Sequence, residues 1–348
     1  MACKLDVVAM QMARSIRQEW CDPGEVLPHD GEYIGGEIFN GSDILEEVGP
    51  FPESGQLTVD LQEFFAASDC CRDNGLAVSQ SERLQFGWKR FCEVVSHQRR
   101  FTFWTDCSDG QSEDNPDYLP TAGMLAEITQ VTNEMGLLQE FPKGTAYWRA
   151  ADHAVSESLP VPNRFTSPPI EFALQPNRMS PAGISMFYGA EYFNTAVLEV
   201  CGNEIHSGRS VSAVQFESCR PLWLLDLCHL NKSVSYYAEN GRVNWHRSAF
   251  LRYFASDISK PIGRDRRQHI DYVPTQVLTE FVRYHMRTVT GISIDGIRYL
   301  SSRNRHPCVV LFFYQEDCLP GRRSRSQSLS CQLTSSRTIR LDTARACS

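Results

Sequence analysis

Hydrophobic residues recur every three or four positions along the first part of the chain, a period typical of amphipathic helices that bury one face. This period predicts helices over Leu5–Trp20, Asp43–Val48, Ser79–Trp104 and Ala122–Gly136. In the third helix, Ser79 or Ser81 can cap the N-terminus, and the apolar stripe consists of Leu84, Trp88, Phe91, Val94 and Val95. The rest of residues 21–60 is rich in Gly, Pro and acidic residues and predicts loops. Residues 1–142 are therefore predicted to form a mainly helical domain.

After residue 142 the pattern changes to short runs rich in β-branched and aromatic residues, which predict strands. The runs are Thr145–Ala151, Ala182–Ala190, Ser210–Ser218, Arg220–Leu227, Ile294–Ser302 and Cys308–Tyr314. Helices are predicted within Glu191–Val200 and over Tyr272–Met286, where Pro274 suits a first helical turn. The predicted fold class is α+β, with a helical domain followed by a mixed β-sheet domain over residues 143–317. Residues 318–348 are rich in Ser and Arg and nearly free of aromatic residues, so a disordered tail is predicted there.

The charge is spread unevenly over the 348 residues, which carry a formal net charge of -8. Residues 1–145 hold 10 Lys and Arg against 25 Asp and Glu, and the remaining residues hold 24 against 17. An acidic front part does not suit the phosphate backbone of a nucleic acid, whereas a basic back part suits a phosphate-bearing small ligand. No run approaches the ~20 apolar residues that span a bilayer, and the N-terminus lacks the pattern of a secretory signal. We therefore expect a cytoplasmic protein that binds neither nucleic acid nor membrane.

The 13 cysteines are scattered, odd in number and without any CxxC pair. In a large chain without a secretory signal, this usage indicates reduced thiols rather than a disulfide framework. A zinc site needs ligands at characteristic short spacings, which are absent here. No bound metal is therefore expected.

The string NRMSPAGISMFYGAEYFNTAVLEV carries three chemically useful side chains. Arg178 precedes a turn, Tyr188 lies near the end of a predicted strand, and Glu199 lies late in the following helix. Taken alone, these residues favour a solvated Arg, a core Tyr and an exposed Glu, because Glu is rarely buried. The alternative is that they line one pocket. Further along, Ser301 and Ser302 end a strand without the GxSxG pattern of a nucleophile elbow, and no GxGxxG, Walker A or HExxH pattern is present.

The back half resembles the RES-domain family, which is named for its Arg, Glu and Ser. The matching strings follow the family order: YWRAA, the Arg178–Val200 string, RPLWLLDL, FASDISKPI, DYVPTQVLTEF, DGIRYLSSR and VVLFFY. The front half, with LQFGWKRFCEVVSHQRRFTFW, resembles the HEPN-like N-terminal domain that accompanies some RES proteins. That half lacks the Arg-x4-His motif of HEPN ribonucleases near His97, so no ribonuclease role is expected.

The resemblance implies a fold like the ADP-ribosyltransferase core, built around an NAD cleft. It also implies an NAD-consuming bacterial toxin that cleaves the nicotinamide N-glycosidic bond by hydrolysis or phosphorolysis. NAD is then a substrate, no permanently bound cofactor is implied, and an antitoxin protein is an implied partner. Two alternatives stay open: an ADP-ribosyltransferase that modifies a cellular protein, and a non-catalytic binding module that senses a nucleotide.

The resemblance also assigns roles to residues. Arg178 corresponds to the family Arg and would bind the pyrophosphate, as a guanidinium fork does well. Tyr188 would contact the nicotinamide ring, and Glu199 would stabilise positive charge on the ribose. Ser301, with the adjacent Ser302 as the alternative, would orient Glu199 or a ribose hydroxyl. Arg149 is implied as a second phosphate contact.

Overall fold

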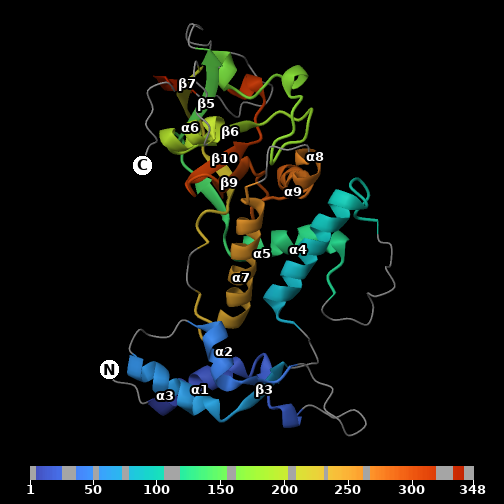
Figure 1. Ribbon diagram of the computed structural model, residues 1–348, viewed down its shortest axis with the longest axis vertical. Coiled ribbons are helices and arrows are strands. Elements are labelled where there is room, and N and C mark those ends of the chain that lie inside the picture. Colours follow the sequence, from blue (N-terminus) through green and yellow to red (C-terminus); the bar gives the residue numbers. More distant parts are fainter. Residues whose placement is uncertain are drawn as a thin grey trace. The chain divides into compact units, whose positions relative to one another are not determined.

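The computed structural model describes residues 5–25, 37–49, 55–72, 78–105, 118–154, 162–202, 209–230, 234–261, 267–318 and 332–340. The chain divides into two compact units, each with its own hydrophobic core (Figure 1). The first unit contains residues 1–89, 105–124 and 231–253. The second contains residues 90–104, 125–230 and 254–348. Both units thus draw on separate stretches of the sequence.

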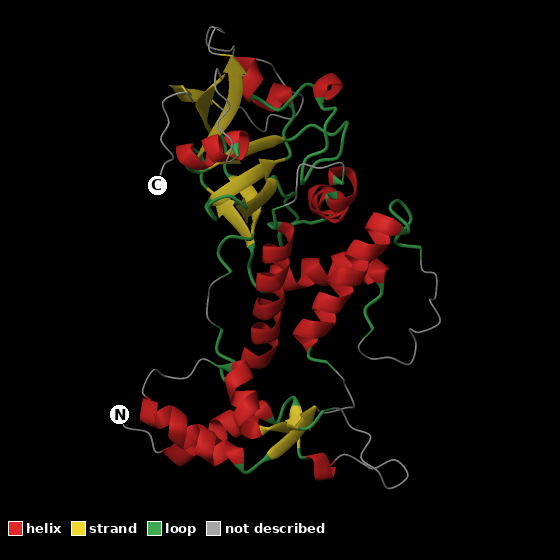
Figure 2. Ribbon diagram, in the orientation of Figure 1, coloured by secondary structure: helices red, strands yellow, loops and turns green. Residues whose placement is uncertain are grey.

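The first unit combines helices with a small antiparallel sheet (Figure 2). Its helices are α1 (Leu5–Ile16), α2 (Gly41–Val48) and α3 (Gly55–Ala66), with a short 3-10 turn at Pro23–Glu25. The strands β1 (Trp20–Cys21), β2 (Phe39–Asn40) and β3 (Asp69–Arg72) form a sheet in the order β1-β3-β2. The core of this unit is formed by Ala9, Met12, Ile16, Trp20, Ile44, Leu45, Val48, Leu61, Phe65 and Tyr236.

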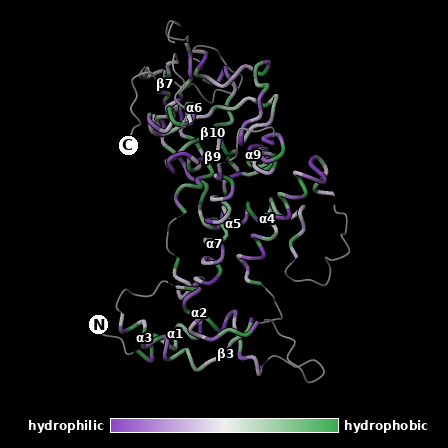
Figure 3. Tube along the Cα trace, in the orientation of Figure 1, coloured by the Kyte–Doolittle hydropathy of each residue, from purple (hydrophilic) through white to green (hydrophobic). Residues whose placement is uncertain are grey.

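Two predicted helices are confirmed as α4 (Gln80–His97) and α5 (Met124–Glu134). Ser79 caps α4 by a reciprocal pair of hydrogen bonds: the Glu82 amide donates to Ser79 Oγ at 3.3 Å, and the Ser79 amide donates to Glu82 Oε2 at 2.7 Å. This capping box satisfies two amides that the helix itself leaves unpaired. The predicted stripe of α4 is buried, and hydrophilic and hydrophobic positions alternate along the helix (Figure 3).

Helices α3 and α7 (Gly241–Ile258) lie outside the ranges that the sequence predicted, as does the four-residue α8 (Gln268–Asp271). Helix α3 falls partly within residues 21–60, whose Gly and Pro content predicted loops; its buried residues are Leu61 and Phe65, one helical turn apart. Helix α7 (Gly241–Ile258) buries the polar His246 and Ser248 beside Phe250 and Phe254. Buried polar residues interrupt the hydrophobic period, which is the signal that predicts a helix.

The second unit is built on an eight-stranded sheet in the order β11-β7-β5-β6-β10-β9-β8-β4. Its strands are β4 (Leu138–Phe141), β5 (Ala146–Ala154), β6 (Phe187–Ala190), β7 (Arg209–Glu217), β8 (Leu222–Asp226), β9 (Gly296–Leu300), β10 (Pro307–Leu311) and β11 (Gln332–Arg340). Neighbouring strands are antiparallel, except for the parallel pair β8 and β9. The helices are α6 (Phe193–Cys201), α8 (Gln268–Asp271) and α9 (Val273–Tyr284), with 3-10 turns at Pro162–Phe165, Ile170–Phe172 and Gln315–Cys318. The 3-10 turn at Thr121–Gly123 belongs to the first unit. The predicted α+β class, a helical region followed by a sheet-rich region, is confirmed.

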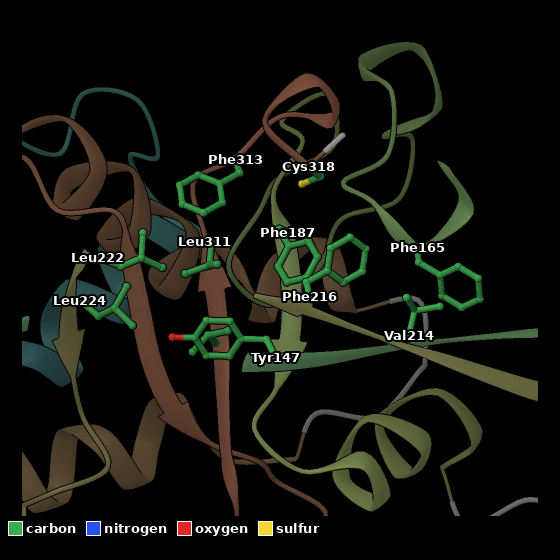
Figure 4. Close-up of a cluster of buried hydrophobic side chains, with 11 residues drawn as sticks. Tyr147, Phe165, Phe187, Val214, Phe216, Leu222, Leu224, Leu311, Phe313 and Cys318 are labelled. Atoms are coloured by element: carbon green, nitrogen blue, oxygen red, sulfur yellow. The ribbon is translucent and has the colours of Figure 1, made fainter. Parts of the chain in front are cut away.

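Aromatic and aliphatic side chains from β5, β6, β7, β8 and β10 form the core of this sheet. Figure 4 shows the rings of Phe187 and Phe216 next to each other, and their centroids lie 5.2 Å apart at an edge-on angle of 75°. Edge-to-face contact of this kind is a preferred aromatic geometry. Helix α6 packs against β5, β6 and β7, and α9 packs against β9 (Figure 1). Both helices are therefore anchored on the sheet.

The segment predicted to be a disordered tail contains a strand, so that prediction is wrong for residues 332–340. Strand β11 pairs antiparallel with β7 from Gln332 opposite Glu217 to Arg340 opposite Ser210, with one register shift. The composition of the segment did not reveal this because strand pairing is made by main-chain groups. An available sheet edge can therefore order a polar segment.

Every helix in the described ranges is too short or too polar to cross a membrane. The same ranges contain no group of three or more His, Cys, Asp and Glu side chains arranged to hold a metal ion.

The first unit contains a buried polar cluster around Glu19. Glu19 Oε1 accepts a hydrogen bond from Arg72 Nη1 at 2.8 Å, and Oε2 lies 3.0 Å from the Tyr236 hydroxyl and 2.8 Å from His246 Nε2. Burial raises the pKa of Glu19, but the hydrogen bonds and charges of His246, Tyr236 and Arg72 outweigh this effect, so the pKa lies below its usual value. The cluster therefore stabilises the ionised carboxylate.

Glu19→Gln should lower the free energy of unfolding at pH 7 by about 3 kcal/mol, the typical cost of breaking a buried ion pair. Because the folded pKa of Glu19 is lowered, its contribution is present above the unfolded value of 4.5 and is lost as the pH falls toward the folded value. Urea unfolding at pH 7 and at pH 4 should therefore show a smaller difference between the variant and wild type at pH 4. Asp6→Asn, which changes an exposed carboxylate of α1, should show little effect at either pH. A Glu19→Gln effect that is equally large at both pH values would contradict this role.

Candidate active site

A tight turn carries Arg178 and is held by helix α9. Main-chain hydrogen bonds close the turn between Asn177 and Ser180, at 2.8 and 3.3 Å. The Gln276 side-chain amide donates to the Asn177 carbonyl at 2.8 Å and to the Ser180 carbonyl at 3.3 Å. The Thr275 hydroxyl donates to the Arg178 carbonyl. Three hydrogen bonds from two consecutive side chains of α9, Thr275 and Gln276, therefore hold this turn in position.

The Arg178 guanidinium is engaged by main-chain carbonyls. Its Nη1 donates to the Ile258 carbonyl at 2.8 Å, and its Nη2 donates to the Lys260 carbonyl at 2.7 Å. These carbonyls lie at the end of α7, where a helix leaves acceptors without internal partners and where a cation is favourable. The Tyr272 ring lies 5.8 Å from the guanidinium carbon. Arg178 thus stabilises a helix end, and it is not among the described residues that line the neighbouring cavity.

Tyr188, at the second position of β6, lies between this turn and β5. Its hydroxyl is 2.9 Å from Ser180 Oγ, and its carbonyl accepts a hydrogen bond from Arg149 Nη1 at 3.1 Å. Burial raises the pKa of Tyr188 to about 12, against the smaller opposing effects of the hydrogen bonds from Ser180 and the Met179 backbone. At neutral pH Tyr188 is therefore an uncharged phenol.

Glu199 and Ser301 meet, although about a hundred residues separate them in the sequence. The Ser301 hydroxyl donates a hydrogen bond to Glu199 Oε1 and accepts one from the Arg303 amide at 3.1 Å. Ser301 is fully buried, whereas Glu199 is exposed toward the cavity. The buried serine thus orients one carboxylate oxygen. Of the two adjacent serines, Ser301 makes this contact.

The cavity has a volume of about 360 Å³ and lies between β5, β6 and α6. Three of the five predicted residues line it: Arg149, Tyr188 and Glu199. Its apolar lining includes Trp148, Phe172, Ile184, Met186, Ala190 and Ala196. The cavity thus combines apolar side chains with convergent polar groups, as small-ligand sites do.

The partly buried Arg149 differs from Arg298, a buried arginine in the same sheet. Arg298 donates to both Glu191 and Asp226, with contacts of 2.6 and 3.0 Å, and although burial lowers its pKa these carboxylates raise it on balance. Among the residues that the structure describes, no carboxylate pairs with Arg149. It contacts the Tyr188 carbonyl and, at 5.3 Å, the Phe187 ring, and burial lowers its pKa. A partly buried cation without a carboxylate partner is unfavourable unless a ligand supplies the negative charge.

Sequence reasoning assigned no site role to three further residues. Tyr299 lines the cavity, and burial, with the nearby Cys308 and Glu199, raises its pKa well above the ordinary value. Its position two residues before Ser301 was an available signal, since alternate residues of a strand share a face. Thr275 and Gln276 belong to the YVPTQ string, which was recognised only as the start of a helix and as a match to a family.

The fold and the site together define an α+β protein with a partly apolar cavity that contains a carboxylate and a guanidinium that pairs with no described carboxylate. The model of the RES domain matches residues 146–334, more than half of the chain, and the model of HEPN/RES N-terminal domain 1 matches residues 1–109. The chain belongs to the RES domain family. Membership associates it with NAD-processing proteins in general. Neither the curated proteins nor the solved structures that were compared contain a match to this chain.

Gln276→Glu should lower the free energy of unfolding at pH 7 by about 2 kcal/mol, because a carboxylate would face two carbonyl oxygens in place of an amide donor. The unfavourable contacts should raise the folded pKa of the new carboxyl group. The loss should therefore be largest at pH 7 and should shrink as the pH falls and the carboxyl group regains a proton. Urea unfolding between pH 7 and pH 5 measures this recovery.

Gln276→Leu is the matched control, since it removes the same hydrogen bonds without adding a titrating group. Its deficit relative to wild type should be independent of pH in that range. If the free energies of unfolding of the Glu and Leu variants changed in parallel with pH, the Gln276 amide would not contact the carbonyls of the turn.

Proposed function

We propose that the cavity binds NAD and that the protein cleaves the bond between nicotinamide and ribose. The observation that carries the proposal is the Glu199 carboxylate, which is oriented by buried Ser301 and lines a cavity that is also lined by Arg149, a cation with no carboxylate partner among the described residues. Cleavage of an N-glycosidic bond develops positive charge on the ribose. A fixed carboxylate stabilises that charge without reorganisation during the reaction.

Three further residues would contribute to NAD binding. Arg149 would bind the pyrophosphate, because its guanidinium lacks an anionic partner among the described residues. Tyr188 would present its ring and a neutral hydroxyl to the nicotinamide side. Arg178 would act on the same ligand mainly through the turn that it secures, since both of its terminal nitrogens bind carbonyls. A cavity of 360 Å³ lies near the lower end of the usual range of about 300–1,000 Å³ for ligand sites, so part of the dinucleotide would extend outside it.

Nicotinamide leaves as a neutral base with the bonding electron pair, so a strong general acid is not required. If water attacks the ribose carbon, the products are ADP-ribose, nicotinamide and a proton; if inorganic phosphate attacks, the product is the 1-phosphate of ADP-ribose. A toxin with this activity would deplete NAD, and an antitoxin protein would be the partner that restrains it. As part of this proposal, the fold of the second unit resembles the ADP-ribosyltransferase core.

The test is nicotinamide release from NAD by full-length protein that is free of any antitoxin. Glu199→Gln should reduce kcat by about 100-fold or more, as for other removals of a charge-stabilising group. Glu280→Gln is the matched control, because Glu280 is an exposed carboxylate on α9 that does not line the cavity. The control should retain wild-type activity. Unchanged NAD with wild type, or equal rates for wild type and Glu199→Gln, would overturn the proposal.

The products separate the alternatives. Label from NAD that remains on a protein would favour ADP-ribosyl transfer over hydrolysis or phosphorolysis. NAD binding without turnover would favour a nucleotide-sensing module.

Arg149→Met should raise the free energy of unfolding without ligand by at most about 1 kcal/mol, because it replaces a partly buried cation, which pairs with no described carboxylate, by an apolar side chain of similar length. The same change should weaken NAD binding roughly 10- to 100-fold, which is the usual worth of a charge-assisted hydrogen bond. Binding is measured in the Glu199→Gln background, where turnover is slow. Arg178→Met is the contrasting variant and should lower stability, because it leaves the carbonyls of Ile258 and Lys260 without their donors. If Arg149→Met lost stability and kept its affinity, Arg149 would be a structural residue.

A further inference from the structure

Two cysteines of the first unit face each other across the β1–β3 pair. The strand register places Cys21 directly opposite Cys71, and their Sγ atoms lie 3.5 Å apart. The Cys21 sulfur is 3.7 Å from the Cys71 carbonyl, and the Cys71 sulfur is 3.8 Å from the Cys21 carbonyl. Both thiols therefore occupy the same small space between the strands.

We propose that Cys21 and Cys71 are a modification site that forms a reversible disulfide bond. Directly opposed residues of an antiparallel pair have Cα atoms about 4.5 or 5.5 Å apart. Both distances lie within the range of about 4.4–6.8 Å that disulfides span. Bringing the sulfurs from 3.5 Å to the bonded distance of about 2.05 Å is within reach of small side-chain rotations. The bond can therefore form without a change of strand register.

The accessibility of the two thiols sets the order of the reaction. Cys21 is half-buried and Cys71 is fully buried. The Cys21 thiolate would attack a small-molecule disulfide such as glutathione disulfide, forming a mixed disulfide and releasing one thiolate. The Cys71 thiolate would then attack the Cys21 sulfur and expel the second small thiol. The two cysteines lose two electrons and two protons, which the external disulfide takes up as two thiols.

The neighbouring Cys70 provides an internal comparison. It is opposite Phe39 of β2, and alternation along a strand directs its side chain to the face opposite that of Cys71. Burial and the nearby acidic groups of Cys71, Asp22 and Asp69 raise its pKa, which lowers the fraction of reactive thiolate. Cys70 is thus the less suitable partner for Cys21, although it is adjacent to Cys71 in the sequence.

The disulfide would join β1 to β3 and enclose residues 22–70, which include α2 and α3. A cross-link over a long segment stabilises a fold chiefly by restricting the unfolded chain. Next to the bond, Arg72 lies 4.5 Å from the Trp20 ring and donates to Glu19. Oxidation would therefore also secure the strand that supplies the arginine of the buried Glu19 cluster.

The experiment uses the full-length chain, equilibrated in glutathione buffers from fully reduced to fully oxidised. Disulfides are mapped by mass spectrometry after non-reducing digestion, and hydrogen exchange is followed in peptides from α2 and α3. The expected result is a cross-linked Cys21–Cys71 peptide that disappears on addition of a reducing thiol. Exchange in α2 and α3 should slow by at least about tenfold in the oxidised form.

Cys70→Ser is the control and should retain the cross-link and the slower exchange, whereas Cys21→Ser should lose both. The disulfide map of the wild-type protein shows whether the Cys21–Cys71 bond forms, even if a serine variant folds poorly. A bond from Cys21 to Cys70, or no Cys21–Cys71 bond in glutathione disulfide alone, would overturn the proposal. NAD turnover does not enter the readout, so the outcome is independent of the proposed function.

Discussion

The site depends on hydrogen bonds that run from helix α9 to the turn at Asn177–Ser180. The Thr275 hydroxyl and the Gln276 amide bind three carbonyls of that turn. Ser180 in turn binds the hydroxyl of Tyr188, whose carbonyl binds Arg149. Fixing the backbone of each residue costs about 1–2 kcal/mol of conformational entropy. The bonds from α9 offset this cost and hold the four-residue turn in one position.

Three arginines of the second unit show how the environment decides the role of one residue type. Arg298 is neutralised by two carboxylates and braces neighbouring strands. Arg178 is neutralised by helix-end carbonyls and secures a turn. Arg149 is partly buried and contacts one carbonyl and an aromatic ring. Of these three arginines, Arg149 alone has no described group that neutralises its charge. Charged groups without a compensating partner are typical of ligand sites, where some stability is lost for the sake of function.

The sequence patterns predicted elements with clear periodicity and failed where another force dominated. The stripe of α4, its Ser79 cap and most strands of the sheet followed from spacing alone. Helix α7 did not, because it buries His246 and Ser248 against polar partners. Strand β11 did not, because a free sheet edge orders it through its main chain. The candidate site residues were predicted from the resemblance to a family. The roles of Tyr299 and Gln276 could not be predicted, because they depend on which faces of the strands and helices meet in the folded protein.

By itself, the sequence determined the α+β class and the chemical groups that a cavity could use. These properties are local, because helix and strand preferences depend on residues a few positions apart. Only the tertiary structure decided that Ser301 orients Glu199, that Arg178 binds the end of α7, and that no carboxylate in the described part of the chain pairs with Arg149. Such pairings join residues tens to about a hundred positions apart, and their geometry is created by the packing of α6 and α9 on the sheet.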